Sequence, residues 1–257
     1  MTVARTSADE LLAIAAECWG FLESERLDGW ELRAGAGFTN RANSAWPLGP
    51  LSRPLPRALE HVRAWYAERG LPPQLLAPVG SDFDEELTAH GCGEGRDGAI
   101  RQIAPLAPAL EALAEYEHPN VPVSTTDRPQ DRWLRLYRAG SLPPQAKEIL
   151  GSGERYFYAT IYDEFSGEPL SIGRAVLAGE SGSWVGLAAI ETDPEARRRG
   201  LARLILNTLL NWAAAQGAEH AMLEVRQDNE AAQALYEGLG FVTAHQYHYR
   251  AVPADPA

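Results

Sequence analysis

The 257-residue sequence has few cysteines, a single lysine and no long apolar run. Its two cysteines, Cys18 and Cys92, are far apart and show no metal-ligand spacing, which predicts reduced thiols and neither a disulfide framework nor a metal site. No segment reaches the roughly 20 apolar residues that a membrane span needs, and the N-terminus lacks the apolar run of a signal peptide. These absences predict a cytoplasmic protein without a metal and without a membrane partner.

Positive charge is also scarce. Asp and Glu number 35 against 23 Lys and Arg, and the formal net charge is -12. General nucleic-acid binding needs a basic face that neutralises phosphates, so we expect no nucleic-acid partner. A local anion site remains compatible with this composition, because a small ligand responds to the local field more than to the net charge.

The segment 119-PNVPVSTTDRPQDRW-133 is rich in turn-forming residues and has little hydrophobic periodicity. We therefore expect a first domain at residues 1–118, a linker at 119–132 and a second domain at 133–257. In the second domain, alternating and helical periodicities predict strands at 155–163, 170–178, 184–192, 221–226 and 241–250, and helices at 201–217 and 229–238. The fold class is α/β with layered α+β character: a mixed, mostly antiparallel sheet flanked by helices.

A weak repeat relates the two halves of the chain. Residues 57–78 align with residues 204–225, so that Trp65 falls on Trp212, Gly70 on Gly217 and Leu76 on Leu223. This order predicts two related α/β units in tandem, and two ordinary helix–strand pairs are the alternative. The first unit has 50-PLSRPLPRAL-59 where the second has its arginine-rich turn; the three prolines remove backbone donors, which predicts a degenerate unit.

The stretch 191-ETDPEARRRGLAR-203 lies between a predicted strand and a predicted helix. The first turn of a helix has N–H groups without intrahelical partners and a partial positive charge. Gly200 and Ala202 keep side chains away from these groups, and the arginines add forked, charged donors that suit phosphate. The stretch therefore predicts a pyrophosphate site.

Two motifs resemble those of the GNAT acetyltransferase superfamily: 191-ETDPEARRRGLARLI-205 resembles its acyl-CoA-binding motif, and 222-MLEVRQDNEAAQALYEGLGF-241 its second motif. The resemblance spans residues 184–250 and implies a GNAT-like fold and an acetyl-CoA-dependent N-acetyltransferase. Arg197, Gly200 and Ala202 match the fixed positions of the first motif. The cofactor-binding residues that the resemblance implies are Ile190, Glu191, Thr192, Arg197, Arg198, Arg199, Gly200, Leu201, Ala202, Arg203 and Asn229.

Acetyl transfer to an amine needs a route for the amine proton and a proton for the departing thiolate. By resemblance Tyr236 is the general acid; a core aromatic on a helix face is the alternative. Glu224, in the motif LEVR that ribosomal-protein alanine acetyltransferases share, is the candidate base. On the alternating strand it either points into a cleft or pairs with an arginine. Glu191 is a second, weaker candidate for the base.

We therefore expect direct transfer of an acetyl group from acetyl-CoA to a primary amine, on a small molecule or a peptide N-terminus. A non-catalytic acyl-CoA sensor is the alternative function. The acidic balance of the chain favours a cationic acceptor, while its oligomeric state is not predicted. Trp30, Arg33 and Asn43 line either a pocket or a plain hairpin, and His245 and His248 lie on opposite faces of a strand, which argues against a metal pair.

Overall fold

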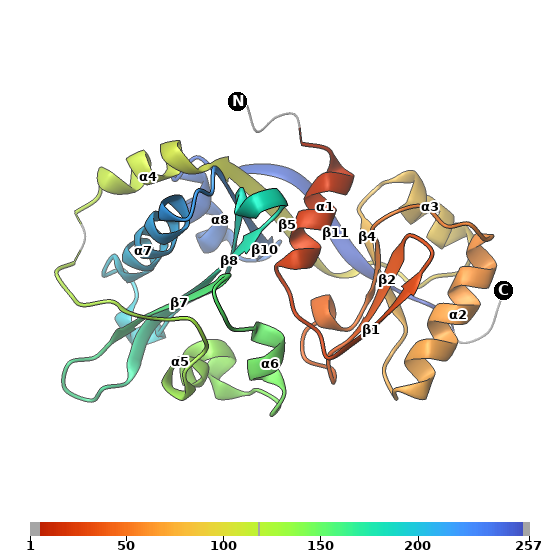
Figure 1. The fold of residues 1–257 in the computed structure, drawn as a ribbon, viewed down its shortest axis with the longest axis horizontal. Coiled ribbons are helices and arrows are strands. Elements are labelled where there is room, and N and C mark those ends of the chain that lie inside the picture. The colour runs from red at the N-terminus through yellow and green to blue at the C-terminus, as the bar shows by residue number, and fades with distance from the viewer. Residues whose placement is uncertain (1–5, 118, 254–257) are drawn as a thin grey trace.

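The computed structural model describes residues 6–117 and 119–253; the ends 1–5 and 254–257 of the predicted domains, and residue 118, lie outside the described residues. A single sheet of eleven strands in the order β1-β2-β3-β4-β11-β5-β10-β9-β8-β7-β6 runs through the described residues. Helices cover both of its faces (Figure 1). Two of the neighbouring pairs, β3–β4 and β9–β10, are parallel and the other pairs are antiparallel. The predicted fold class is confirmed.

The first half of the chain, residues 6–117, carries the hairpin and two helix–strand units. Its elements are α1 (Ala8–Glu17), β1 (Glu23–Leu27), β2 (Trp30–Ala34), η2 (Asn40–Ala42), β3 (Ala45–Pro47), α2 (Leu55–Glu68), β4 (Gln74–Pro78), α3 (Asp82–Ala89), β5 (Arg96–Pro105) and α4 (Leu106–Ala114).

The second half, residues 119–253, begins with an edge strand and short helices. Its elements are β6 (Ser124–Thr126), α5 (Asp131–Leu136), η3 (Tyr137–Gly140), α6 (Ala146–Leu150), β7 (Tyr156–Tyr162), β8 (Pro169–Ala178), η4 (Glu180–Gly182), β9 (Trp184–Thr192), η5 (Pro194–Ala196), α7 (Leu201–Ala215), β10 (His220–Arg226), α8 (Glu230–Glu237) and β11 (Val242–Ala251). The five strands and two helices predicted after residue 133 are all present. The predicted linker contains β6, which pairs with β7 and so belongs to the sheet.

The order of elements repeats between the halves. After each parallel-paired strand, β3 or β9, come a helix, a strand, a helix and a strand: α2-β4-α3-β5 in the first half and α7-β10-α8-β11 in the second. The last strands are exchanged between the halves, because β5 pairs with β10 and β11 pairs with β4. Helix α4 follows β5 and packs on α7. The sheet is therefore continuous across the predicted boundary near residue 118.

Apolar side chains fill both faces of the sheet around β9 and β10. On one face, α4, α7 and α8 cover a cluster that includes Leu209, Leu223 and Val225. On the other face, α1, α5 and α6 cover a cluster that includes Trp133 and Met222. Because side chains alternate along β10, Met222 and Glu224 point to the face covered by α1, and Leu223 and Val225 point to the face covered by α7. In the described residues, none of the helices is both long and apolar enough to cross a membrane.

An ionic cluster of Asp84, His248 and Arg250 links β11 to the first half of the chain. The carboxylate of Asp84, on α3, accepts hydrogen bonds from His248 Nε2 at 2.8 Å and Arg250 Nη1 at 2.6 Å. It also accepts the backbone N–H of Gly80 at 3.1 Å. Burial alone would raise the pKa of Asp84, but these donors and the charges of His248 and Arg250 lower it below its ordinary value of 3.8. The cluster therefore stabilises the fold with Asp84 ionised.

We predict that Asp84→Ala lowers the free energy of unfolding by about 3 kcal/mol, because it leaves the buried Arg250 guanidinium without its carboxylate. Urea denaturation measures the loss. The exposed pair Asp127–Arg128 provides the control, since solvent screens this pair and Asp127→Ala should leave the free energy of unfolding nearly unchanged. The contribution of ionised Asp84 to the free energy of unfolding should be complete above pH 3.8. It should disappear as the pH falls through the lowered pKa of Asp84 in the folded state. Equal losses in the two variants would contradict the assignment.

Candidate active site

Strands β9 and β10 pair along only part of their length. Their parallel register runs from Trp184 opposite His220 to Leu187 opposite Leu223 and ends there. Ala189, just beyond, has a positive φ of 55°, a conformation that turns the backbone of β9 away from a regular strand. Further along, β9 still pairs with β8, whereas no strand of the described residues pairs with its edge toward β10. A gap therefore opens in the sheet between residues 188–192 and residues 224–226.

A cleft of about 970 Å³ occupies this gap and extends to the start of α7. Its lining includes all but one of the predicted site residues, namely Ile190, Glu191, Thr192, Arg197, Arg198, Gly200, Leu201, Ala202, Arg203, Glu224, Asn229 and Tyr236. Arg199 is the exception. Its side chain is exposed outside the cleft, close enough to Asp163 for its charge to contribute to the lowered pKa of that carboxyl.

Helix α7 begins without a side-chain cap. Its N-cap residue, Gly200, has φ 77°, in the left-handed region that glycine adopts without steric cost. The N–H groups of the first turn consequently have no intrahelical acceptor and no capping oxygen. Together with the positive end of the helix dipole, these groups in the cleft wall suit a phosphate ester.

The arginines around this turn differ in their contacts. Arg197 Nε lies 3.4 Å from the carbonyl oxygen of Thr192, so it reaches back to the end of β9. The guanidinium of Arg203 lies over the Tyr116 ring at 3.9 Å, and its buried Nε has no hydrogen-bond partner within the described part of the chain. Arg198 lines the cleft with an exposed side chain. All three arginines line the cleft, and none of them is paired with a carboxylate within the described part of the chain, so their charges remain available to a bound anion.

Tyr236, on α8, faces the same cleft near the gap between the strands. Its side chain is buried and lies beside the Phe241 ring, with the ring centroids 5.8 Å apart. Burial raises the pKa of Tyr236 well above its ordinary value of 10.0. The phenol therefore keeps its proton at neutral pH and can donate a hydrogen bond into the cleft.

Glu224 lies between two arginines of the first half. Its Oε1 accepts hydrogen bonds from Arg101 Nη2 at 2.6 Å and Nε at 3.2 Å, and its Oε2 accepts one from Arg41 Nε. Arg101 also contacts His245 Nε2 at 2.8 Å through Nη1. Burial would raise the pKa of Glu224, but the two guanidinium groups outweigh it and lower the pKa from 4.5 to about 2. Burial and Arg101 lower the pKa of His245 to about 4, so its imidazole is neutral.

These contacts answer the question that the sequence left open about Glu224. The side chain both pairs with arginines and lines the cleft. The two guanidinium groups keep this carboxylate ionised and make it a weak base, and its role as the general base stays a prediction.

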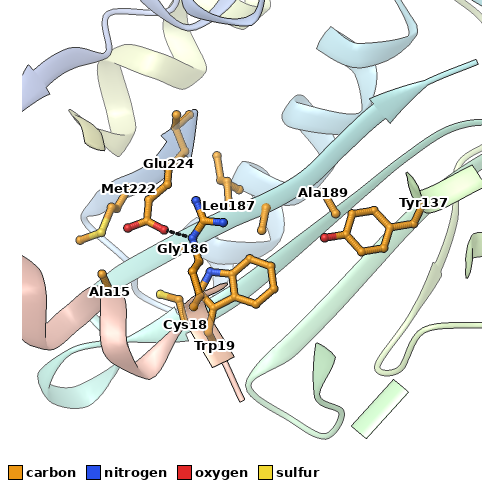
Figure 2. Close-up of a pocket in the computed structure, with 12 residues that line it drawn as sticks. Ala15, Cys18, Trp19, Tyr137, Gly186, Leu187, Ala189, Met222 and Glu224 are labelled. Atoms are coloured by element: carbon orange, nitrogen blue, oxygen red, sulfur yellow. Dashed lines mark hydrogen bonds and ion pairs between the residues drawn. The ribbon is translucent and has the colours of Figure 1, made fainter. Parts of the chain in front are cut away.

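A second cavity, of about 110 Å³, adjoins the cleft on the α1 side of the sheet. Figure 2 shows Ala15, Cys18 and Trp19 on one side of it, Met222 and Glu224 on another, and Tyr137 across from them. Gly186, Leu187, Ala188, Ala189, Leu223 and Arg41 complete the lining. Leu187, Ala188, Ala189, Leu223, Glu224 and Tyr137 line both spaces, so the two cavities meet where the strands separate.

Sequence reasoning missed Trp19, Arg41 and Arg101, because their partners are distant in sequence. From the part of the chain around Arg41, it named Trp30, Arg33 and Asn43 instead. Trp30 is buried, Arg33 pairs with Glu31, and Asn43 ties the loop by accepting the N–H of Gly35 at 2.8 Å. These three side chains therefore pack the β1–β2 hairpin and the loop that follows it, and they are absent from the linings of the two cavities.

Comparison with known proteins places the chain in a family. A family model described as "Probable histone acetyltransferase Rv0428c C-terminal" matches residues 8–250. The chain is 33% identical over 98% of its length to the probable histone acetyltransferase Rv0428c of Mycobacterium tuberculosis, of which it covers 76%. The chain belongs to the GNAT family of N-acetyltransferases. Another GNAT relative, the [ribosomal protein bS18]-alanine N-acetyltransferase of Salmonella typhimurium, is 37% identical over 46% of this chain and 77% of that protein.

Solved GNAT structures share the fold. A GCN5-related N-acetyltransferase from Kribbella flavida superposes with a TM-score of 0.66 at 15% identity, over 99% of this chain and 97% of that chain. A tandem GNAT protein from the clavulanic acid biosynthesis pathway gives 0.64 at 14% identity, over 97% and 94%. These similarities support a tandem GNAT architecture. Among the described residues, no group of three or more His, Cys, Asp or Glu side chains is arranged to hold a metal ion.

We predict that Gly200→Glu weakens the binding of acetyl-CoA by roughly tenfold or more, because it places a carboxylate among donors that suit phosphate. Isothermal titration calorimetry measures the affinity. Gly217→Glu is a matched control at the other end of α7: its φ is 92° and the space around an added Cβ is open. It therefore carries similar backbone strain and the same charge away from the cleft. Equal affinities in the two variants would rule out the anion site.

Proposed function

We propose that this N-acetyltransferase transfers an acetyl group from acetyl-CoA to a primary amine by direct attack on the thioester. The observation that carries the proposal is the meeting of two cavities at Glu224, where β9 and β10 separate. The larger cavity offers unpaired N–H groups and arginines to a phosphorylated carrier. The smaller one opens at the same point from the opposite face of the sheet and accommodates the amine.

In this proposal the carrier's phosphates bind at the start of α7, to the N–H groups from Arg198 to Arg203. The free edge of β9 at Ile190, Glu191 and Thr192 pairs with the amide groups of the pantetheine arm, since those backbone groups have no partner strand on that side. Asn229 contributes to the wall, although its Oδ1 already accepts the N–H of Ala232 at 3.2 Å and caps α8.

The reaction forms a bond between the amine nitrogen and the acetyl carbon and breaks the bond between that carbon and sulfur. The leaving thiolate takes a proton from the Tyr236 hydroxyl, and solvent returns a proton to the phenolate before the next turnover. The attacking nitrogen loses a proton. Because the pKa of Glu224 is about 2, we assign this residue a hydrogen bond that orients the amine, and the proton leaves to solvent.

We expect Tyr236→Phe to lower kcat by roughly 10²-fold or more while leaving acetyl-CoA affinity unchanged, because only the proton donor is lost. CoA release measures kcat and calorimetry measures the affinity. Tyr162→Phe, at a tyrosine outside both cavities, is the control. Full activity in Tyr236→Phe would remove the residue from the mechanism. Acetyl-CoA binding without amine-stimulated release by any acceptor would instead support a sensor.

The pH dependence of kcat/KM tests the role of Glu224. With a pKa of about 2, Glu224 is ionised throughout the working range, so the ascending limb should follow the pKa of each acceptor amine. Glu224→Gln should lower kcat/KM by roughly tenfold without moving that limb. Glu191→Gln is the comparison variant, because it removes another carboxylate that lines the cleft. It shows whether the loss of kcat/KM is specific to Glu224. The opposite outcome is a kcat/KM that rises between about pH 5 and 7 in wild type and does not do so in Glu224→Gln. That outcome would make Glu224 a general base.

A further inference from the structure

Positive charge exceeds negative charge around the smaller cavity once Arg101, which lies behind the lining and binds Glu224, is counted with Arg41. Among the described residues that line this cavity, Glu224 is the only carboxylate, and Arg41 and Arg101 bind it. Arg101 is fully buried, and its Nε, Nη1 and Nη2 are all engaged by Glu224 and His245. Because Arg101 neutralises Glu224 and the His245 imidazole is uncharged, Arg41 is the surplus cation.

Arg41 has hydrogen-bond donors that no protein acceptor within the described residues uses. Its Nε binds Glu224, and within the described residues its two terminal nitrogens have no hydrogen-bond partner. The side chain is 19% exposed, so the guanidinium is partly shielded from bulk water while its terminal nitrogens stay accessible from the cavity. A shielded guanidinium with two free donors is suited to a bidentate contact with a carboxylate.

The surrounding structure holds Arg41 in this position. Its guanidinium lies over the Trp19 ring at 5.2 Å, and its carbonyl oxygen accepts a hydrogen bond from Trp46 Nε1 at 3.0 Å. Thr39 Oγ1 accepts the N–H of Ala42, and Asn43 Nδ2 donates to the Thr39 carbonyl at 2.8 Å. Asn43 is thus a positioning residue for Arg41.

Arg41 also lines a third, polar cavity of about 540 Å³, whose lining holds three arginines and two aspartates. Asp97 there accepts a hydrogen bond from Asn40 Nδ2 at 2.9 Å, and Asp228 is paired with Arg226. Arg138 adds a cation whose guanidinium lies over the Phe38 and Tyr137 rings. Within the described chain, both carboxylates of this third cavity thus have a hydrogen-bond or ion-pair partner.

We propose that the acceptor is a small amine that also carries a carboxylate, as in an amino acid, and that Arg41 binds this carboxylate. The inference rests on the proposed function and names the acceptor class of the same site. Glu224 accepts a hydrogen bond from the amine, and the apolar walls of Cys18, Trp19 and Met222 contact a small side chain. The local charge thus favours a different acceptor from the cationic one that the net charge of the chain suggests.

The test compares each of several amino acids with its own carboxamide, which keeps the amine and removes the negative charge. CoA release gives kcat/KM for both members of a pair. We expect wild type to prefer the amino acid, and Arg41→Gln to reduce the ratio of the two values by roughly tenfold or more. Arg41→Lys should retain part of the preference. Arg57→Gln, on the exposed face of α2, should leave the ratio unchanged.

The ratio is independent of the fraction of folded enzyme and, compared between variants, of amine basicity. An unchanged ratio in Arg41→Gln, or wild-type activity confined to amines without a carboxylate, overturns the assignment of Arg41 while the acetyltransferase proposal stands. If no amine in a broad panel stimulates CoA release, the proposed function itself fails. The two failures are therefore distinguishable.

Discussion

The register of β5 is the constraint on which the site depends. This strand comes from the first half of the chain, yet it lies between β10 and β11, and its Arg101 is directly opposite Glu224 on one side and His245 on the other. A slip of one residue would turn Arg101 to the other face of the sheet, because side chains alternate along a strand. Glu224 would then be a buried carboxylate with one arginine partner, and the charge balance of the smaller cavity would be lost.

A second contact between the halves sets the opposite wall of that cavity. Arg174, on β8, is fully buried and donates to the carbonyl oxygens of Cys18 and Leu150. Its guanidinium also lies over the Trp19 ring at 4.7 Å. The C-terminus of a helix carries partial negative charge, so a buried cation at the end of α1 is favourable there. In Figure 1, α1 lies at the middle of the molecule, and this contact holds it against the sheet of the second half.

The sequence predicted the second half well because its signals are local. Periodicity located β7, β8, β9, α7, β10, α8 and β11, and the glycine before α7 marked the open helix terminus. The site's charges were less predictable. Arg41 and Arg101 are 183 and 123 residues from Glu224 in sequence, and only the strand exchange brings them together. The side chain of Arg199 lies outside the cleft because adjacent residues of the turn point to different sides, which residue spacing alone does not reveal, and a role for its backbone N–H stays a prediction.

The two halves supply different kinds of recognition. The second half binds its proposed carrier mainly through backbone groups, at the start of α7 and along β9. In the first half, α2 begins at Leu55 with Pro54 as its N-cap and Pro56 within its first turn, so its terminus offers fewer donors to an anion. We propose that this half has no carrier site and instead provides side chains, Trp19 and Arg41, to the acceptor. An acidic chain can still bind two anionic ligands in this way, because charges more than about 10 Å away are largely screened and the nearby donors dominate.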